Sequence, residues 1–302
     1  MLKRTLAFQN PCYLKCNLEQ LVVSYKGIPG YDTLADKTVP LEDVGVIILE
    51  HQQITLTHFL IARCMYYNIA LICCDATHHP TGLMLNLNGN TTQSEKFKWQ
   101  IAASEPLKKQ LWQQIISSKI TNQAAVFKHI GLDGYTLKFY AADVKSGDTT
   151  NAEGSAAAYY WQRVFVHLPK FYRRREGEPP NNMLNYGYAI IRAITARALV
   201  GAGLMPTLGV WHRNRYNAYC LADDLMEPYR PFVDKTVINI TNTTANYTQL
   251  TPDIKKTLLS IPQIDVTIDG QTSPLFNAIQ KSAYSLAKCF EGTTRKLTLP
   301  IL

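Results

Sequence analysis

The chain has 302 residues, of which 46% are hydrophobic and 18% charged, so it can form one large or two smaller domains and is not a disordered chain. Its net charge of +8 favours polyanionic partners, although the charge by itself is more often only that of a basic soluble surface. The sequence contains no apolar stretch long enough to span a membrane and no signal peptide at its start, which predicts a cytoplasmic protein.

The first third of the chain alternates between short apolar runs and turns, as expected of β-strands. Short strands are predicted between residues 4 and 25, and buried strands are predicted over 44–49 and 69–74, with a short helix between the two. His78-His79-Pro80-Thr81-Gly82 then breaks the pattern. We therefore expect a small β-rich domain over residues 1–85.

Seven cysteines, an odd number, fit free thiols in a reducing compartment. Some of them lie near one another or near histidines, as zinc ligands do, but they lack the usual two-residue spacing between paired cysteines. Buried thiols in strands are the favoured interpretation. The residues in question are Cys12, Cys16, Cys73, Cys74, His78 and His79.

From Thr92 onward, apolar residues recur at three- and four-residue spacing, which predicts helices. Residues 86–302 are therefore expected to form a larger all-α domain, so the fold class is α+β. The predicted helices cover 96–102, 105–120, 136–144, 181–202 and 273–289.

Glu153 follows a polar segment, 145–151, that ends one helix and begins the next. Thr150 or Asn151 can cap the new helix. A glutamate in a first turn commonly stabilises the helix dipole or completes a capping box, so this position alone does not establish a site.

A histidine and three acidic residues, His212, Asp223, Asp224 and Glu227, fall within sixteen residues of this basic chain. The acids are predicted on one helix at spacings that share a face, where like charges repel unless a cation or arginines neutralise them. The turn at 213–217 must bring His212 back toward Glu227, because a straight helix would hold them about 22 Å apart. One imidazole with carboxylates suits manganese or magnesium acting on phosphodiesters, and an exposed acidic turn is the alternative.

Two groups of arginines are candidate phosphate contacts. One group lies in a loop that contains proline and glycine, and the other lies beside the acidic residues; a solvated loop, or pairing of Arg230 with Asp223 or Asp224, is the alternative. The candidates are Arg173, Arg174, Arg175, Arg213, Arg215 and Arg230.

Four motifs occur in order: Asn-Ala-Glu-Gly at 151–154, Asn-Tyr-Gly-Tyr at 185–188, Gly-Leu-Met-Pro-Thr-Leu-Gly-Val-Trp-His at 203–212 and Asp-Leu-Met-Glu-Pro-Tyr-Arg-Pro at 224–231. Together they resemble the "Cas one" family, the universal adaptation proteins of CRISPR systems, over nearly the whole chain. The resemblance is strongest to the type II subgroup, which works beside an RNA-guided effector nuclease. It implies an N-terminal β domain and a C-terminal helical domain that carries a metal-dependent catalytic site.

The resemblance implies that Glu153, His212 and Glu227 are catalytic metal ligands for Mg²⁺ or Mn²⁺. Asp223 or Asp224 could share the third position, which is an aspartate in many relatives. It also implies homodimers that join a small partner, "Cas two", in a heterohexamer, bind double-stranded DNA and insert short fragments into the CRISPR repeat by 3′-hydroxyl attack. A non-catalytic DNA-binding scaffold is the alternative, which the complete ligand set disfavours.

Overall fold

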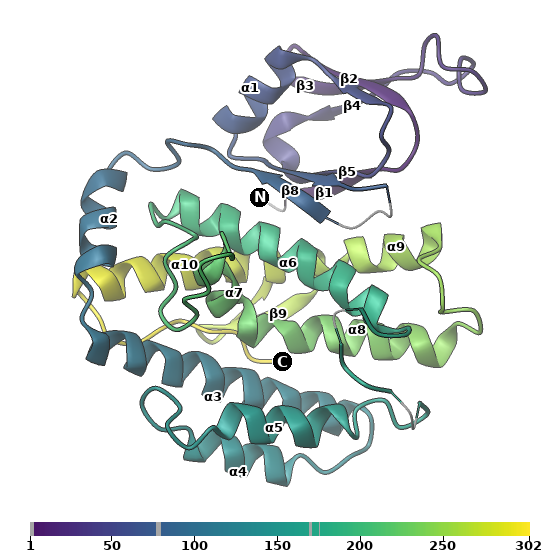
Figure 1. The fold of residues 1–302 in the computed structure, drawn as a ribbon. Helices are drawn as coiled ribbons and strands as arrows, with labels where there is room; N and C mark the ends of the chain where they lie inside the picture. The colour runs from purple at the N-terminus through teal and green to yellow at the C-terminus, as the bar shows by residue number, and fades with distance from the viewer. Residues whose placement is uncertain (1–2, 77–79, 169–170, 175) are drawn as a thin grey trace. The chain divides into compact units, whose positions relative to one another are not determined.

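The computed structural model describes residues 3–76, 80–168, 171–174 and 176–302. The chain forms two compact units, Met1–Thr91 and Thr92–Leu302, a few residues beyond the boundary expected at residue 85. Strands dominate the first unit and helices the second (Figure 1), so the predicted order of a β-rich part followed by a mostly helical part is confirmed.

The N-terminal unit contains two four-stranded sheets, with strand orders β1-β5-β7-β8 and β4-β3-β2-β6. In the first sheet β1, β5 and β7 run parallel and β8 is antiparallel to β7. The central strand β5 is almost wholly buried, which explains its unbroken apolar sequence. The elements are β1 (Arg4–Phe8), β2 (Cys12–Asn17), β3 (Gln20–Ser24), β4 (Lys37–Pro40), a 3₁₀ turn (Leu41–Asp43), β5 (Val44–Leu49), β6 (Ile54–Leu56), α1 (His58–Tyr66), β7 (Ala70–Cys74) and β8 (Pro80–Met84).

The cysteines of the described residues are free thiols, as the sequence predicted. Cys12 and Cys64 lie in the core of the N-terminal unit, where burial raises the pKa of Cys12 to about 11 and that of Cys64 to about 12. These two thiols are therefore protonated at neutral pH and pack as small apolar groups. His78 and His79, the histidines of the zinc alternative, lie outside the described residues.

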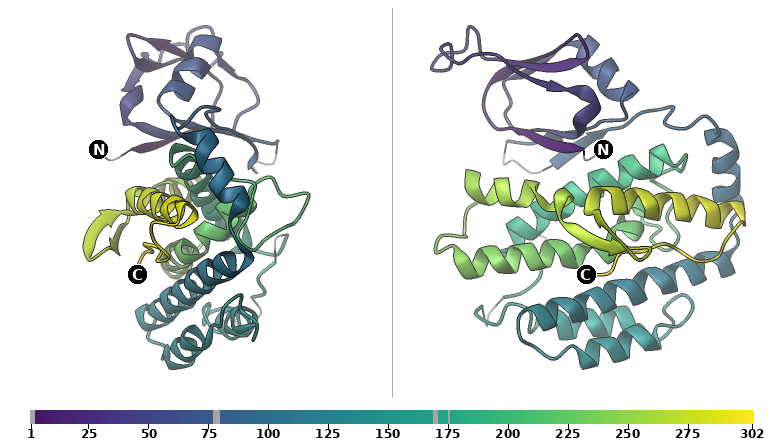
Figure 2. Two further views of the ribbon diagram at one scale, coloured as in Figure 1. Left: turned by 90° about the vertical axis from the view of Figure 1, so that its left-hand side faces the viewer. Right: turned by 180° about the vertical axis from the view of Figure 1, so that it is seen from behind.

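The C-terminal unit is built around α6, whose residues are buried along most of the helix. It contacts α7, α8, α9 and α10, while α3 contacts α4, α5, α7 and α8. Figures 1 and 2 show α3, α4 and α5 lying side by side. The elements are α2 (Gln93–Ala102), α3 (Glu105–His129), α4 (Tyr135–Asp143), α5 (Ala152–Trp161), α6 (Asn181–Gly201), α7 (Cys220–Met226), a 3₁₀ turn η2 (Glu227–Tyr229), α8 (Arg230–Thr243), α9 (Pro252–Leu259), a 3₁₀ turn (Ile261–Gln263), β9 (Asp265–Ile268), β10 (Gln271–Pro274) and α10 (Leu275–Glu291).

Several features of this unit were not predicted, among them the helices α8 and α9. The helix expected to end at residue 120 continues to His129, because no helix-breaking residue precedes Gly131. The unit also contains an antiparallel hairpin, β9–β10, so it is not entirely helical. Its turn is formed by Asp269 and Gly270, both at positive φ, the Asp-Gly signal of a tight hairpin.

Glycine is required where α6 meets α8. A Cβ atom at Gly187 would lie 2.4 Å from Cγ1 of Val233, so a larger residue would force the helices apart. This close approach explains the glycine of the Asn-Tyr-Gly-Tyr motif. Within the described residues, no helix combines the length and the apolar character needed to cross a membrane.

Candidate functional site

Glu153 is placed in the first turn of α5 by a cap that the sequence did not identify. Asn151 precedes the helix, but its side chain makes no capping hydrogen bond. Instead, the carboxylate of Asp148 accepts hydrogen bonds from the backbone amides of Ala152 at 2.8 Å and Glu153 at 3.1 Å. The expected cap at Thr150 or Asn151 is therefore wrong. Asp148 satisfies the helix N-terminus and leaves the side chain of Glu153 free to point elsewhere.

The loop that carries His212 is held at its beginning by Gln100 of α2. This buried side chain accepts a hydrogen bond from the amide of Met205 at 2.9 Å and donates to the carbonyls of Met205 and Leu208 at 3.0 and 3.1 Å. Gly203, at positive φ, ends the preceding helix as the sequence predicted. These contacts fix the loop against the helical body.

Gly209 allows the same loop to fold tightly around Asp224. A Cβ atom at Gly209 would lie 2.4 Å from the carbonyl oxygen of His212 and 2.8 Å from Oδ2 of Asp224. Only glycine permits this approach without movement of the backbone. The loop can then donate the Trp211 amide to Oδ2 of Asp224, at 2.9 Å.

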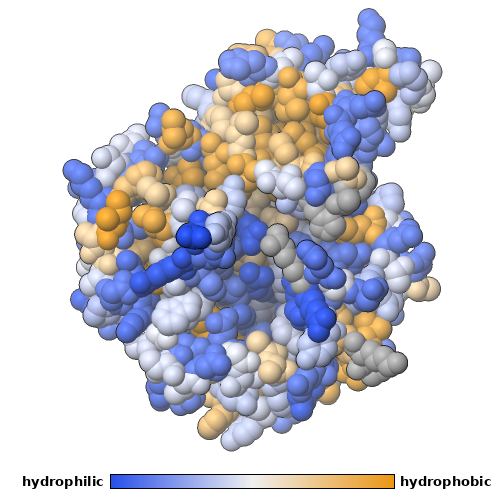
Figure 3. Space-filling view, in the orientation of Figure 1, coloured by the Kyte–Doolittle hydropathy of each residue, from blue (hydrophilic) through white to orange (hydrophobic). Residues whose placement is uncertain are grey.

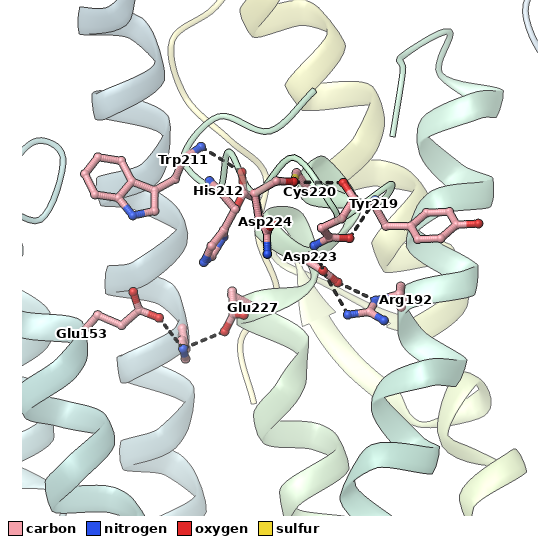
Figure 4. A network of polar contacts seen from close by, with 12 residues as sticks. Glu153, Arg192, Trp211, His212, Tyr219, Cys220, Asp223, Asp224 and Glu227 are labelled. Carbon is pink, nitrogen blue, oxygen red and sulfur yellow. Dashed lines mark hydrogen bonds and ion pairs between the residues drawn. The ribbon is translucent and has the colours of Figure 1, made fainter. Parts of the chain in front are cut away.

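His212 and Asp224 form the centre of the polar network in Figure 4. Nδ1 of His212 lies 2.5 Å from Oδ1 of Asp224, whose side chain is fully buried. This hydrogen bond raises the pKa of His212, against the opposing effect of partial burial of the ring. Burial also raises the pKa of Asp224, by more than its hydrogen bonds from His212 and Trp211 lower it. Asp224 thus fixes the ring through Nδ1 and directs Nε2 away from itself.

Glu227 begins the 3₁₀ turn η2 at the end of α7, and its carboxylate is buried between two cations. Oε1 lies 2.8 Å from Nε of Arg230, and Oε2 lies 2.7 Å from Nζ of Lys119. Burial alone would raise the pKa of Glu227, but Arg230 and Lys119 outweigh it and lower the pKa to about 2. Glu227 is therefore ionised at neutral pH.

Lys119, on α3, also contacts Glu153. Its Nζ atom lies 2.7 Å from Oε1 of Glu153, the same distance as from Glu227. The structure therefore brings together two of the predicted ligands, from α5 and η2. Because one Nζ atom contacts both carboxylates, Oε1 of Glu153 and Oε2 of Glu227 lie at most twice 2.7 Å apart. His212 contacts Asp224, three residues before Glu227, so the turn at 213–217 does bring it back toward Glu227.

Asp223 has a different partner. Its carboxylate forms a two-point ion pair with Arg192 of α6, at 2.6 and 3.0 Å, and accepts a hydrogen bond from Asn217 at 2.7 Å. The three acids therefore do not share one face toward a common partner. Asp223 faces Arg192 and Asp224 faces His212 (Figure 4), whereas Glu227 pairs with Lys119. Across the described ranges, no three His, Cys, Asp or Glu side chains are arranged closely enough to hold a metal ion together.

The candidate phosphate-binding arginines differ in their surroundings. Arg213 is exposed and pairs with Glu105, and Arg215 contacts Tyr216. Both line a cleft of about 460 Å³ beside His212, together with Lys108. The space-filling view shows hydrophilic side chains gathered over the helical unit (Figure 3).

The four other predicted arginines have structural contacts or lie outside the described residues. Arg173 donates hydrogen bonds to Asn181 and Asn185 at the start of α6, and Arg230 is held by Glu227 and by the ring of Tyr188. Arg174 lies over the ring of Tyr172. Arg175 lies outside the described residues.

Sequence reasoning missed Lys119 and Trp112, which lie two helical turns apart on one face of α3. The ring of Trp112 is stacked on Trp211 at 5.6 Å and meets the edge of His212 at 5.4 Å. Nothing local distinguishes Lys119 from a solvated helix lysine, because its partners lie 34 and 108 residues farther along the chain. For Trp211, the stacking partner of Trp112, the sequence offers one indication of a role at the site, which is its position directly before His212.

Replacing Asp224 by asparagine is expected to lower the free energy of unfolding by about 2 kcal/mol. The buried carboxylate that accepts hydrogen bonds from the His212 ring and from the Trp211 amide would be lost. The pKa of His212 is raised in the folded protein, so the stabilisation by this pair is complete below the ordinary histidine pKa and fades as pH rises through the raised value. Urea unfolding at pH 6 and pH 9 measures this. The difference between wild type and variant should be larger at pH 6, and an equal difference would contradict a charged pair.

Comparison with known proteins gives a consistent family. The sequence profile described as "CRISPR associated protein Cas1" matches residues 6–260. A CRISPR-associated endonuclease Cas1 from Neisseria meningitidis is 37% identical over 300 residues, covering 98% of this chain and 95% of that protein. Another from Francisella tularensis subsp. novicida is 32% identical over 205 residues, covering 59% of this chain and 64% of that protein.

Solved structures share the fold at lower identity. A casposase bound to an integration product superposes with a TM-score of 0.80 at 20% identity, covering 98% of this chain and 92% of that one. A Cas1 protein from Thermotoga maritima gives a TM-score of 0.74 at 14% identity, covering 96% and 97%. A chain of a Cas6-RT-Cas1–Cas2 complex gives 0.72 at 21% identity, covering 97% of this chain and 35% of that one.

Proposed function

The chain belongs to the Cas1 family of CRISPR-associated proteins, and from that membership we propose that it is a divalent-metal-dependent DNA endonuclease and integrase. In the cytoplasm, it would insert short foreign DNA fragments into the CRISPR array. Each fragment would be joined to the array by attack of its 3′ hydroxyl on a phosphodiester. The Neisseria meningitidis relative is named an endonuclease, and the casposase that shares the fold was solved with an integration product. Both names support this class of reaction.

One observation carries the proposal: Glu153 and Glu227, far apart in sequence, present their carboxylates to the same cation. Oε2 of Glu227 is buried and accepts no hydrogen bond of normal geometry, so its contact with the Lys119 ammonium is electrostatic. A buried, ionised oxygen of this kind, a second carboxylate and an imidazole are the donors that Mg²⁺ or Mn²⁺ accepts. The donor types therefore suit such an ion, with His212 as the nitrogen donor, and the three side chains would draw closer together when it binds.

Each residue then has a defined task. Glu153, Glu227 and His212 would hold the metal, and Asp224 would keep Nε2 of His212 directed toward it. When bound, a divalent ion polarises a phosphoryl oxygen and makes a nearby hydroxyl a better nucleophile. Arg230 keeps Glu227 ionised, while Arg213 and Lys108 line the adjacent cleft where phosphates of the DNA would lie.

In the joining step, the 3′ oxygen of the fragment forms a bond to phosphorus as the bond to the outgoing oxygen of the repeat breaks. The attacking hydroxyl gives up its proton, and the outgoing oxygen gains one. Such phosphoryl transfer depends on positioning and charge stabilisation more than on covalent participation by the protein. The rigid loop and the buried charges of this site supply both.

The partners follow from the same proposal. The complexes whose Cas1 chains share this fold also contain Cas2, so we propose a homodimer that assembles with a Cas2-like protein in a heterohexamer on double-stranded DNA. An RNA-guided effector nuclease, as in type II systems, is a further partner that we propose. The net charge of +8 favours DNA binding through phosphate contacts.

A non-catalytic DNA-binding scaffold is the second candidate. Lys119 favours it, because an ammonium already neutralises Glu153 and Glu227 in this structure. The two functions predict different results. A scaffold would bind DNA equally well with and without a divalent ion, and it would not join DNA strands.

Removal of metal tests the proposal. With its Cas2-like partner, the protein is expected to join a labelled DNA fragment to a supercoiled plasmid carrying the repeat in Mg²⁺ or Mn²⁺, and to make no product in excess EDTA. Gel analysis of the labelled plasmid measures joining, and an electrophoretic mobility shift measures DNA binding in the same buffers. Retained binding with no joining in either metal would favour the scaffold.

A further inference from the structure

Lys119 occupies an unusual place for a lysine. Its side chain is only 12% exposed, and its ammonium lies 2.7 Å from both Glu153 and Glu227. The ammonium is thus within ion-pair distance of two carboxylates that come from different parts of the chain. Exposed ion pairs are weak and exchange with water, whereas this one joins three separate elements: α3, α5 and η2.

The charges around this point balance without a metal. Glu153 and Glu227 contribute two negative charges, and Lys119 and Arg230 contribute two positive ones. A divalent cation added beside an unmoved ammonium would leave two uncompensated positive charges at this point. Metal–oxygen bonds of about 2.1 Å to the same carboxylates would also place the ion in close contact with Nζ.

The two cations on Glu227 differ in their ability to move. Arg230 is a planar guanidinium held by Glu227 and stacked on the ring of Tyr188, 4.6 Å from its centre. Lys119 has a compact ammonium on a flexible four-carbon chain, which can change rotamer and leave while its backbone stays in α3. Of the two cations, the Lys119 ammonium is therefore the one that can move away from Glu227.

We propose that the Lys119 ammonium is a built-in counter-ion that fills the position of the divalent metal between Glu153 and Glu227, and that metal binding displaces it. In this role Lys119 keeps the two carboxylates assembled before the metal arrives and lowers the affinity for the metal, because its attraction to them must be overcome. The inference rests on the proposed metal-dependent function and adds a competitor to its site.

Calorimetric titration with Mn²⁺ alone tests the competition. Lys119→Met removes the charge and keeps much of the volume, and it is expected to bind Mn²⁺ at least about 10-fold more tightly than wild type. Without metal the variant should melt at a lower temperature, since the buried carboxylate of Glu227 and the partly buried one of Glu153 lose their counter-ion. Mn²⁺ should raise the Tm of the variant by more than it raises that of wild type. Lys119→Arg keeps a charge and should not gain affinity. Lys128→Met, an exposed position on the same helix, should match wild type.

The outcomes separate this inference from the proposed function. If His212→Ala weakens Mn²⁺ binding but Lys119→Met binds no more tightly than wild type, the metal site stands and the counter-ion role is wrong. If neither wild type nor Lys119→Met binds Mn²⁺, the metal-dependent function and the inference both fail. If Lys119→Met is unfolded without metal, Mn²⁺ should restore its folded circular dichroism spectrum. Failure to do so, with Lys119→Gln binding Mn²⁺ no more tightly than wild type, would overturn the competition.

Discussion

His212→Ala is expected to reduce strand transfer by at least about 100-fold while leaving the fold and DNA binding intact. The imidazole is the only nitrogen donor in the proposed ligand set, and its other nitrogen is fixed by Asp224. The ring is about half exposed, with its side chain 46% accessible, so its removal leaves a small void at the surface and not in the core. Joining of a labelled fragment to a plasmid, with Mn²⁺ or Mg²⁺, measures the loss.

His129→Ala is the matched control for this variant. His129 lies at the end of α3, where its Nε2 atom contacts Asn239 at 3.1 Å, away from the acidic residues. It should retain wild-type strand transfer. If a folded, DNA-binding His212→Ala protein joined fragments as well as the control, His212 would not be a ligand, and the metal assignment would have to be abandoned.

Gly209→Ala is expected to reduce strand transfer by about 100-fold without touching a proposed ligand, because displacement of catalytic groups by about 1 Å has costs of that size. The added methyl would lie 2.4 Å from the carbonyl of His212 and 2.8 Å from Oδ2 of Asp224, so the loop must move and the contact between Asp224 and the ring must open. Overpacking of this kind should also lower the free energy of unfolding by about 1–3 kcal/mol. Strand transfer and urea unfolding measure the two effects.

Gly82→Ala serves as the control for the added methyl group. Its Cβ atom would lie 3.6 Å from Cβ of Cys73, an ordinary contact, so both stability and strand transfer should stay close to wild type. Wild-type activity in Gly209→Ala, with an unchanged crystal structure of the loop, would show that this close approach does not position His212.

The fold class followed from local pattern. Alternation in the first third and three- to four-residue spacing after Thr92 gave the β-rich and helical units, because these periods report which side chains face a core. The hairpin β9–β10 was missed although its Asp269-Gly270 turn is a recognised signal. The overlooked turn, and not an absent signal, caused that error.

The candidate ligands Glu153, His212 and Glu227 also came from sequence alone, through four motifs in a fixed order. Motif order identifies residues but carries no information about which way each side chain points. The cap of α5 shows this limit. Sequence placed it at Thr150 or Asn151, whereas Asp148 reaches it because the chain takes positive φ at both Asp148 and Asn151.

The sequence by itself determined the order of a β-rich part and a mostly helical part, the family resemblance and the residues proposed to bind a metal. Only the tertiary structure decided their partners: Asp223 pairs with Arg192, Asp224 orients His212, and Lys119 joins the two glutamates. Periodicity and capping act over a few residues, so they can be seen in the sequence. Ion pairs between distant elements depend on the rotation and packing of whole helices, which no local stretch encodes.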